Sequence, residues 1–339
     1  MSAVLRRLQV AGSDQAFDCA PGDTVLRAAQ RAGLGFPYEC NVGSCGNCRF
    51  ELVQGELDTL WPQAPGWTEK DRQRRRHLGC QSSPATDCTI KLRLEDAYAP
   101  VHRPARTRAA LRWARPITHD ISEFAFELEV PMSFEPGQYA LVQMPGVQGV
   151  RAWSMSNAPE PGQGATHLEF QVRRVAKGEG SAVLFGMAPG TAVEVDGPYG
   201  MAWLRRDVPR DILCLAGGSG LAPMISIARG AMHEPRLAPR QLHFVYGGRT
   251  PQDLCGLDML QALPGWGQRL HYHAYVSSPP PGWEGPAGFV HEAAAHLFAG
   301  QLPGFEVYFA GPPAMATAVQ KMLLDAGVPP AQQHFDQFY

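Results

Sequence analysis

Four cysteines in the first quarter of the chain have a spacing that suits iron. Cys40, Cys45 and Cys48 lie within nine residues, and Cys80 follows after 31 more. The pattern C-x₄-C-x₂-C…C is the plant-type [2Fe–2S] arrangement. The residues between the cysteines are small or tolerate a positive φ, which lets a loop wrap closely and aim its N–H groups at anionic sulfur: Gly43, Ser44, Gly46 and Asn47.

A structural zinc site is the alternative for these cysteines. Zinc ribbons prefer two C-x₂₋₄-C pairs, whereas the fourth cysteine here stands alone, so the spacing favours the iron–sulfur cluster. The other cysteines lie outside this spacing, and we expect them to be small buried hydrophobes: Cys19, Cys88, Cys214 and Cys255. The first residues lack the features of a signal peptide, so we expect no disulfide framework.

A second set of residues suits a flavin dinucleotide. One stretch is Arg151-Ala152-Trp153-Ser154, and a later one opens a helical stretch with Gly178, Gly180 and Ser181. Arg151 would hold the pyrophosphate, the helix start and its hydroxyl would bind the same phosphates, and Ser154 and Trp153 would approach the ring. Each feature alone is weak. The prediction depends on their order, followed by Gly197-Pro-Tyr-Gly200.

Three glycine-containing loops suit a nicotinamide nucleotide. The first follows the apolar strand Ile212–Ala216 and contains Gly217, Gly218, Ser219, Gly220 and Pro223. A glycine turn after a strand brings a helix start to a pyrophosphate, although Pro223 replaces the third glycine of the G-x-G-x-x-G pattern. The other two loops follow later strands, where open parallel sheets bind ligands, and contain Gly247, Arg249, Gly311, Pro312, Pro313 and Met315.

The composition limits the class of protein. The chain has 339 residues, enough for two or three domains, and a formal net charge of −2, which argues against a general nucleic-acid binder. The uncharged stretch Ile212–Ala228 contains three glycines and a proline and is shorter than a membrane span, so we expect a strand, a turn and a helix start. We therefore expect a cytoplasmic protein without membrane or nucleic-acid partners.

The pattern of apolar residues divides the chain into three parts. Residues 1–98 predict a small α+β unit, with a hairpin over Val4–Val10 and Gln15–Cys19 and a helix that Thr24 caps. Residues 99–106 suit an extended linker. Residues 107–204 contain short β-rich runs that predict an antiparallel barrel, and residues 207–339 alternate strands and helices as a parallel α/β sheet does.

In this order, the motifs resemble the ferredoxin–NADP reductase superfamily, in its class with an N-terminal ferredoxin: the reductases of multicomponent bacterial oxygenases. Three segments further resemble reductases of soluble di-iron toluene and alkene monooxygenases: Phe36–Cys48, Leu60–Gly66 and His334–Tyr339. The resemblance implies a β-grasp ferredoxin domain (1–98), a β-barrel FAD domain (107–204) and a NAD(P) domain (207–339). It also implies FAD, NADH and one [2Fe–2S] cluster with the ligands Cys40, Cys45, Cys48 and Cys80.

The chain departs from this family at two positions. Trp153 stands where the family usually has Tyr, so one hydroxyl is missing from the Arg-x-Tyr-Ser flavin motif. Ala310 stands where Cys commonly precedes Gly-Pro-Pro, next to the expected nicotinamide site. The resemblance also implies that the C-terminal Phe338 or Tyr339 stacks on the flavin.

The function that follows is electron transfer from NADH through FAD and the cluster to an oxygenase system, as a monomer. The acceptor would be a ferredoxin or a hydroxylase, with a di-iron monooxygenase favoured over a Rieske dioxygenase and a non-redox zinc module as a distant alternative. No acid or base catalyst is needed, because hydride transfer moves no separate proton. Arg249 leaves NADPH open as a donor. The basic run Arg72–His77 is a solvated helix face or a docking patch for an acidic partner.

Overall fold

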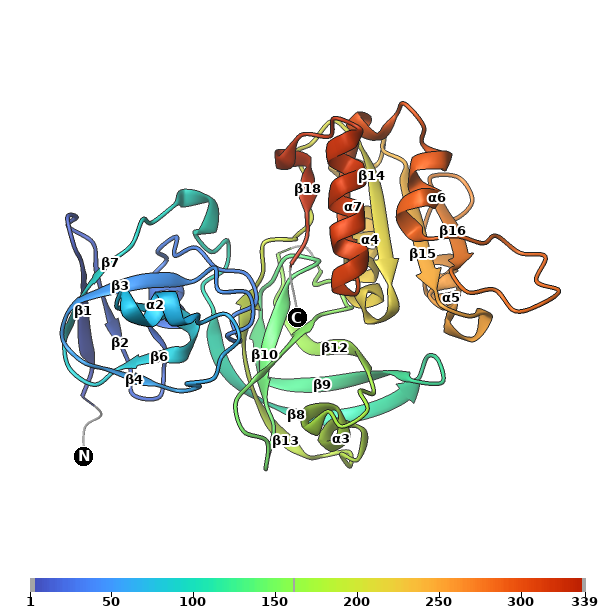
Figure 1. Ribbon diagram of the computed structural model, residues 1–339. Helices are drawn as coiled ribbons and strands as arrows, with labels where there is room; N and C mark the ends of the chain where they lie inside the picture. Colours follow the sequence, from blue (N-terminus) through green and yellow to red (C-terminus); the bar gives the residue numbers. More distant parts are fainter. Residues whose placement is uncertain (1–3, 161, 337–339) are drawn as a thin grey trace. The chain divides into compact units, whose positions relative to one another are not determined.

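The computed structural model describes residues 4–160 and 162–336, which form two compact units. The first unit contains the chain up to Ala105 together with Gly197–Tyr199, and the second contains Arg106–Asp196 and Gly200–Asp336. No helix among the described residues is long and apolar enough to cross a membrane. The predicted domain boundaries stay predictions, since the second unit holds both the barrel and the parallel sheet (Figure 1).

The first unit is a mixed sheet with one main helix, the ferredoxin-like fold that the sequence predicts. Its strand order is β2-β1-β7-β3-β5, with β1 and β2 antiparallel and β1 and β7 parallel. Thr24 caps helix α1 by accepting a hydrogen bond from the N–H of Arg27, as expected. Its elements are β1 (Arg6–Val10), β2 (Ala16–Cys19), α1 (Val25–Arg31), β3 (Arg49–Gln54), β4 (Leu57–Thr59), α2 (Glu69–Gln73), β5 (Arg76–Leu78), η1 (Gly79–Gln81), β6 (Ser82–Pro84), β7 (Cys88–Lys91) and η2 (Asp96–Tyr98).

The second unit begins with a six-stranded antiparallel sheet in the order β11-β10-β13-β8-β9-β12. Met155, just after β11, forms an isolated bridge with Phe170 in β12, so the sheet curls towards a barrel. Aromatic and aliphatic residues fill its interior, which explains the alternating pattern seen in the sequence. Its elements are β8 (Ala105–Pro116), β9 (Ile121–Met132), β10 (Tyr139–Gln143), β11 (Arg151–Ser154), β12 (Ala165–Arg173), α3 (Glu179–Phe185) and β13 (Ala192–Tyr199).

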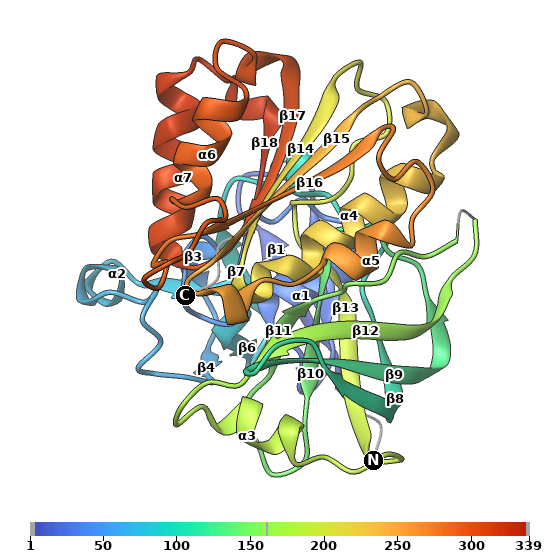
Figure 2. The ribbon, with the colours of Figure 1, turned by 90° about the vertical axis from the view of Figure 1, so that its right-hand side faces the viewer.

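The rest of the second unit is a parallel sheet with the order β16-β15-β14-β17-β18. Helices α4 and α5 cover one face and α6 and α7 the other (Figure 2). The elements are β14 (Asp211–Gly217), η3 (Gly218–Gly220), α4 (Leu221–His233), η4 (Pro235–Leu237), β15 (Leu242–Gly248), η5 (Pro251–Asp253), α5 (Leu257–Gln261), β16 (Leu270–Val276), α6 (Val290–Leu297), η6 (Leu302–Gly304), β17 (Phe305–Ala310), α7 (Pro313–Asp325), η7 (Pro330–Gln332) and β18 (Gln333–His334).

Helix α4 joins the parallel sheet to the barrel. The hydroxyl of Ser226 donates to the carbonyl of Asn157 at 2.7 Å and accepts from the N–H of Gly137 at 3.1 Å. One turn further on, Arg229 donates to the carbonyl of Ser156 and to the carboxylate of Glu169. These hydrogen bonds fix the barrel against the parallel sheet within this unit, because buried polar groups rarely stay unpaired.

Candidate functional site

The cysteine loop brings its sulfur atoms together in pairs. Cys40, Cys48 and Cys80 are buried free thiols and Cys45 is partly exposed. The sulfur atoms of Cys48 and Cys80 lie 3.4 Å apart, and the N–H of Cys45 donates to the sulfur of Cys40 at 3.3 Å. Hydrogen bonds from the Cys45 thiol and from backbone N–H groups lower the pKa of Cys40 to about 5, against the effect of burial.

Backbone geometry explains the residue types in this loop. Gly43 and Gly46 have φ values of +90° and +80°, which confirms the expectation that this loop uses residues that tolerate a positive φ. Asn41 also has a positive φ, of 54°, and the sequence analysis missed it. The buried Arg27 of α1 holds Asn41 through two hydrogen bonds of 3.2 Å, to its side chain and to its carbonyl. These four thiols, with N–H groups aimed at sulfur, fit the requirements of a [2Fe–2S] cluster.

The remaining cysteines behave mostly as expected. Cys19, Cys88 and Cys214 are buried, in agreement with the prediction. The prediction was wrong for Cys255, which is partly exposed and whose thiol donates to the Tyr246 hydroxyl at 3.2 Å. This hydroxyl in turn donates to the carbonyl of Gly218. Cys255 and Tyr246 therefore form a hydrogen-bonded chain that ends on the first glycine loop.

The candidate flavin residues meet at the edge of the barrel. Among the described residues, β11 pairs with β10 and with no other strand apart from the bridge at Met155. Its residues are all partly exposed: Arg151, Ala152, Trp153 and Ser154. A Cβ on Gly180 would lie 2.6 Å from Nε of Arg151, so the cation rests directly on the first turn of α3. This cradle fits a pyrophosphate, because a charged donor and helix-start N–H groups lie side by side.

Other predicted flavin residues are placed differently. The hydroxyl of Ser181 accepts from the N–H of Val175 at 3.1 Å and lies 3.1 Å from the carbonyl of Gly178. It therefore stabilises the loop before α3. The ring of Trp153 packs on the barrel core, and its centroid lies 6.0 Å from that of the Phe170 ring. Phe338 and Tyr339 lie outside the described residues.

A cavity of about 730 Å³ opens at the carboxyl ends of the parallel strands. Six of the predicted nucleotide residues line it: Gly217, Gly218, Gly247, Arg249, Pro312 and Met315. The other predicted residues lie outside its lining: Ser219, Gly220, Pro223, Gly311 and Pro313. Gly220 lies against β17, where a Cβ would approach the carbonyl oxygen of Ala310 to 2.1 Å. The three predicted loops therefore meet at this cavity. Gly220 does not line it and is instead needed for close packing against β17.

The barrel contributes a wall of this cavity that the sequence analysis missed. Arg173, at the end of β12, pairs with Asp120 at 2.9 Å, and its guanidinium lies 3.1 Å from the place of a Cβ on Gly218. A cation thus faces the glycine turn where a pyrophosphate would bind. No local sequence signal marks this arginine, because its partner loop lies 45 residues further along the chain.

Two carboxylates complete the polar wall. Asp253, in the loop after β15, accepts hydrogen bonds from the N–H and hydroxyl of Thr250 at 2.7 and 2.9 Å. Burial alone would raise the pKa of Asp253, but these bonds hold it below its usual value. The His119 ring lies 4.0 Å from both Asp120 and Asp253. The cavity therefore offers carboxylates as acceptors for ribose hydroxyls beside cations for phosphate.

Comparisons with known proteins agree with this arrangement. Residues 8–85 match the model of the 2Fe-2S iron-sulfur cluster binding domain, residues 108–203 that of the oxidoreductase FAD-binding domain, and residues 214–321 that of the oxidoreductase NAD-binding domain. The match to an iron–sulfur domain overturns the zinc module as an alternative. The predicted cofactor classes, FAD, a [2Fe–2S] cluster and a nicotinamide nucleotide, are confirmed.

Relatives span the full length of the chain. Ferredoxin–NAD(P)⁺ reductase CarAd of Metapseudomonas resinovorans is 37% identical, with 95% of this chain and 96% of the relative covered. The ferredoxin–NAD⁺ reductase component of the alkene monooxygenase system of Xanthobacter autotrophicus is also 37% identical, with 96% and 98% covered. The solved ferredoxin reductase in carbazole 1,9a-dioxygenase has a TM-score of 0.91 at 33% identity over 100% of both chains. The chain therefore belongs to the family of ferredoxin–NAD(P)⁺ reductases that carry FAD and a [2Fe–2S] cluster, the reductase components of bacterial multicomponent oxygenases.

Proposed function

We propose that this chain oxidises NADH in preference to NADPH and supplies single electrons to an oxygenase of the di-iron toluene or alkene monooxygenase type. FAD, when bound, accepts a hydride as two electrons and releases them singly to a one-electron acceptor. The chain's own residues bind the nucleotide, position the flavin and hold the cluster. Support for this proposal comes chiefly from the cavity at the strand ends, where three glycine loops and the barrel wall meet.

The charges around this cavity favour NADH. A 2′-phosphate carries a negative charge and needs several cations, whereas the free ribose hydroxyl can donate to a carboxylate. Asp120 neutralises Arg173, which leaves Arg249 as the arginine of the lining without a salt bridge among the described residues. Asp253 is a second carboxylate in the same wall. A 2′-phosphate near Arg249 would therefore gain one cation and face carboxylates.

Steady-state rates with both nucleotides test this preference. We expect kcat/KM to be at least about tenfold higher for NADH than for NADPH. The variant Arg249→Ala should lower kcat/KM for NADPH by about tenfold, which corresponds to about 1.4 kcal/mol. The same variant should leave the NADH value within about twofold. Equal rates with both nucleotides, or an equal loss for both in the variant, would reject the preference.

The choice of oxygenase follows from two sequence segments and one relative. Phe36–Cys48 and Leu60–Gly66 resemble di-iron monooxygenase reductases, and a relative of 37% identity serves an alkene monooxygenase system. A Rieske dioxygenase is the second candidate, because the solved ferredoxin reductase in carbazole 1,9a-dioxygenase matches the whole fold and the reductase component of naphthalene 1,2-dioxygenase/salicylate 5-hydroxylase systems is 33% identical.

Reconstitution separates these two candidates. The purified holoprotein would be mixed with NADH and either a di-iron hydroxylase or a Rieske oxygenase, and hydroxylated product would be counted per NADH consumed. We expect tight coupling with the di-iron system and mostly uncoupled NADH oxidation with the Rieske system. The reverse pattern would assign the chain to a dioxygenase. Neighbouring genes that encode either oxygenase give an independent answer.

A further inference from the structure

A short surface segment covers the cysteine loop of the first unit. This cover segment, Leu60–Trp67, follows β4 and is tied to the loop by a hydrogen bond from the N–H of Gly66 to the carbonyl of Gly43 at 2.9 Å. At its start, the N–H of Leu60 donates to the carbonyl of Gln81, the residue next to Cys80. The cover segment therefore lies in direct contact with the candidate cluster loop.

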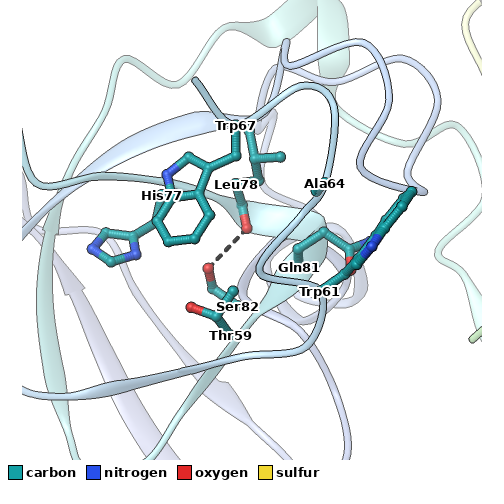
Figure 3. A pocket seen from close by; sticks show the side chains of 8 residues that line it. All are labelled: Thr59, Trp61, Ala64, Trp67, His77, Leu78, Gln81 and Ser82. Atoms are coloured by element: carbon teal, nitrogen blue, oxygen red, sulfur yellow. Dashed lines mark hydrogen bonds between the residues drawn. The ribbon is translucent and has the colours of Figure 1, made fainter. Parts of the chain in front are cut away.

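This cover segment exposes apolar side chains. Leu60 is 52% exposed and Trp61 is 40% exposed, although Leu60 is hydrogen-bonded to the neighbour of the buried Cys80. Trp61 lines a small depression together with Trp67, whose ring lies 5.8 Å from that of His77 (Figure 3). Exposed aromatic residues in such a place are typical of protein–protein contact sites.

Basic side chains border the cover segment. Arg72 donates to the carbonyl of Pro62 at 2.8 Å and its guanidinium lies over the ring of Trp67 at 4.7 Å. The structure corrects one expectation here, because Arg72–His77 is not a single helix face: α2 ends at Gln73 and β5 begins at Arg76. The turn between them exposes Arg74 and Arg75 instead.

Most of these charges are not neutralised locally. The stretch 69–77 has five Lys and Arg residues and two acidic ones in a chain whose net charge is −2. Asp71 pairs with Arg49, and Glu69 pairs with Arg72. Within the described part of the chain, the other four cations form no salt bridge: Lys70, Arg74, Arg75 and Arg76. These cations belong to α2, the turn after it and β5, and Arg72 and the carbonyl of Arg76 connect this stretch to the cover segment. We call the stretch Lys70–Arg76 the positive rim.

We infer that this surface, made of Leu60, Trp61 and the rim Lys70–Arg76, docks an acidic electron-accepting protein. The inference deepens the proposed function and depends on it, since it names where electrons leave the chain. An acidic partner is chosen because complementary charge speeds association, and a central aromatic residue supplies short-range affinity. Contact at this position would also bring the acceptor close to the four cysteines.

Two one-electron acceptors of opposite charge test the rim. The NADH-reduced holoprotein would be mixed by stopped flow with acidic plastocyanin or with a basic c-type cytochrome. NADH yields NAD⁺, a proton and two electrons, so it reduces two plastocyanins from Cu²⁺ to Cu⁺. At low salt we expect Lys70→Glu/Arg74→Glu to slow plastocyanin reduction about tenfold and to speed cytochrome reduction, and both effects should vanish at high salt. Trp61→Ala should slow plastocyanin reduction at every salt concentration.

A charge-matched control is available in the same unit. The double variant Arg6→Glu/Arg93→Glu changes the net charge by the same amount as the rim variant. Arg6 lies in β1 and Arg93 follows β7, and neither strand is adjacent to β5 in the sheet. This control should keep the wild-type rate with plastocyanin. If it slows the reaction as much as the rim variant does, the effect is one of net charge and the inference is wrong.

Cross-linking gives a readout that does not depend on electron transfer. The chain has four lysines, and a carbodiimide joins lysines to carboxylates. With oxidised plastocyanin as the probe, we expect the cross-link at Lys70 and not at Lys91, Lys177 or Lys321, as mass spectrometry would show. A dominant cross-link at another lysine would overturn the assignment of the surface.

The experiments separate the two proposals. If NADH fails to bleach the visible spectrum of the wild-type holoprotein, the proposed function is wrong. If bleaching is normal but the rim variant reduces plastocyanin at the wild-type rate, only the docking surface is wrong. If the rim variant instead slows bleaching itself, the rim serves transfer within the chain, which also rejects an external docking role.

Discussion

Arg49 and Asp71 form an ion pair of 3.0 Å, and the same guanidinium donates to the carbonyls of Gly46 at 2.6 Å and Gly66 at 2.8 Å. One side chain thereby connects the cysteine loop, the cover segment and helix α2. The planar guanidinium suits this task because its donors point in several fixed directions. We therefore expect the shape of the cysteine loop to depend on Arg49 although it is not a ligand.

Substitution of Arg49 should weaken cluster retention. Arg49→Ala removes charge-assisted hydrogen bonds and leaves Asp71 buried without its cation, so we expect a loss of about 1–3 kcal/mol in the free energy of unfolding. Arg49→Lys should recover only part of this loss, since an ammonium lacks the fork geometry. Iron content and urea unfolding measure both effects, with Arg93→Ala as the control. Full iron content in Arg49→Ala would contradict this role.

The same pair predicts a dependence on pH. Burial alone would raise the pKa of Asp71, but hydrogen bonds from Thr68 and Arg49 and the nearby positive charge lower it overall. A carboxylate with a lowered pKa in the folded state binds fewer protons there than when unfolded. Its stabilisation is therefore complete above the unfolded value of about 3.9 and is lost as the pH falls through the folded value.

Asp71→Asn isolates this contribution. We expect the wild type to exceed the variant in free energy of unfolding at pH 6, and this difference to shrink steadily below about pH 4. Urea unfolding across this range measures it. A difference that stays constant with pH would show that Asp71 acts only through packing.

The cysteine assignment makes a selective prediction. Cys48→Ser should abolish the iron and the acid-labile sulfide while NADH still reduces the flavin, because the flavin residues lie on other elements. Cys88→Ser is the matched control, as that buried cysteine lies outside the cluster loop and should keep its iron. Iron analysis and electron paramagnetic resonance of the reduced protein distinguish the two variants. Iron retained in Cys48→Ser would remove it from the ligand set.

The flavin cradle can be tested from either side. Arg151→Ala should raise the dissociation constant for FAD about tenfold, which corresponds to about 1.4 kcal/mol. Gly180→Ala should do the same without loss of charge, because the added Cβ would displace the Arg151 guanidinium. Fluorescence titration of apoprotein with FAD measures both, and the exposed Arg112→Ala serves as the control. If Gly180→Ala binds FAD normally, the contact with Arg151 is not needed.

Gly220 should be intolerant of a side chain. A Cβ there would come within 2.1 Å of the Ala310 carbonyl oxygen, so Gly220→Ala must shift the first nucleotide loop or strand β17. We expect a loss of about 1–3 kcal/mol in stability and a raised KM for NADH. Gly304→Ala, where a Cβ meets nothing within 4 Å, is the control. Wild-type kinetics for Gly220→Ala would show that the loop relaxes freely.

Local chemistry was readable from the sequence. The cysteine spacing, the Thr24 cap, the hairpin before it and the strand–turn–helix over Ile212–Ala228 all depend on neighbours a few residues apart, and the structure contains each of them. The antiparallel barrel and the parallel sheet were likewise predicted from short periodic patterns. Such features need no knowledge of distant contacts, because backbone preference and hydrophobic period specify them.

Tertiary structure alone decided which distant residues meet. Arg173 faces Gly218, and Arg49 connects Gly46 to Gly66, through contacts between segments that no short pattern relates. The basic run next to Cys80 was predicted as a solvated helix face or a docking patch, and packing divided it between α2, a turn and β5. The sequence by itself thus determined the cofactor classes and the elements that hold them. Folding decided the walls of the cavity and the supports of the cluster loop, because charge pairing and close packing act between neighbours in space.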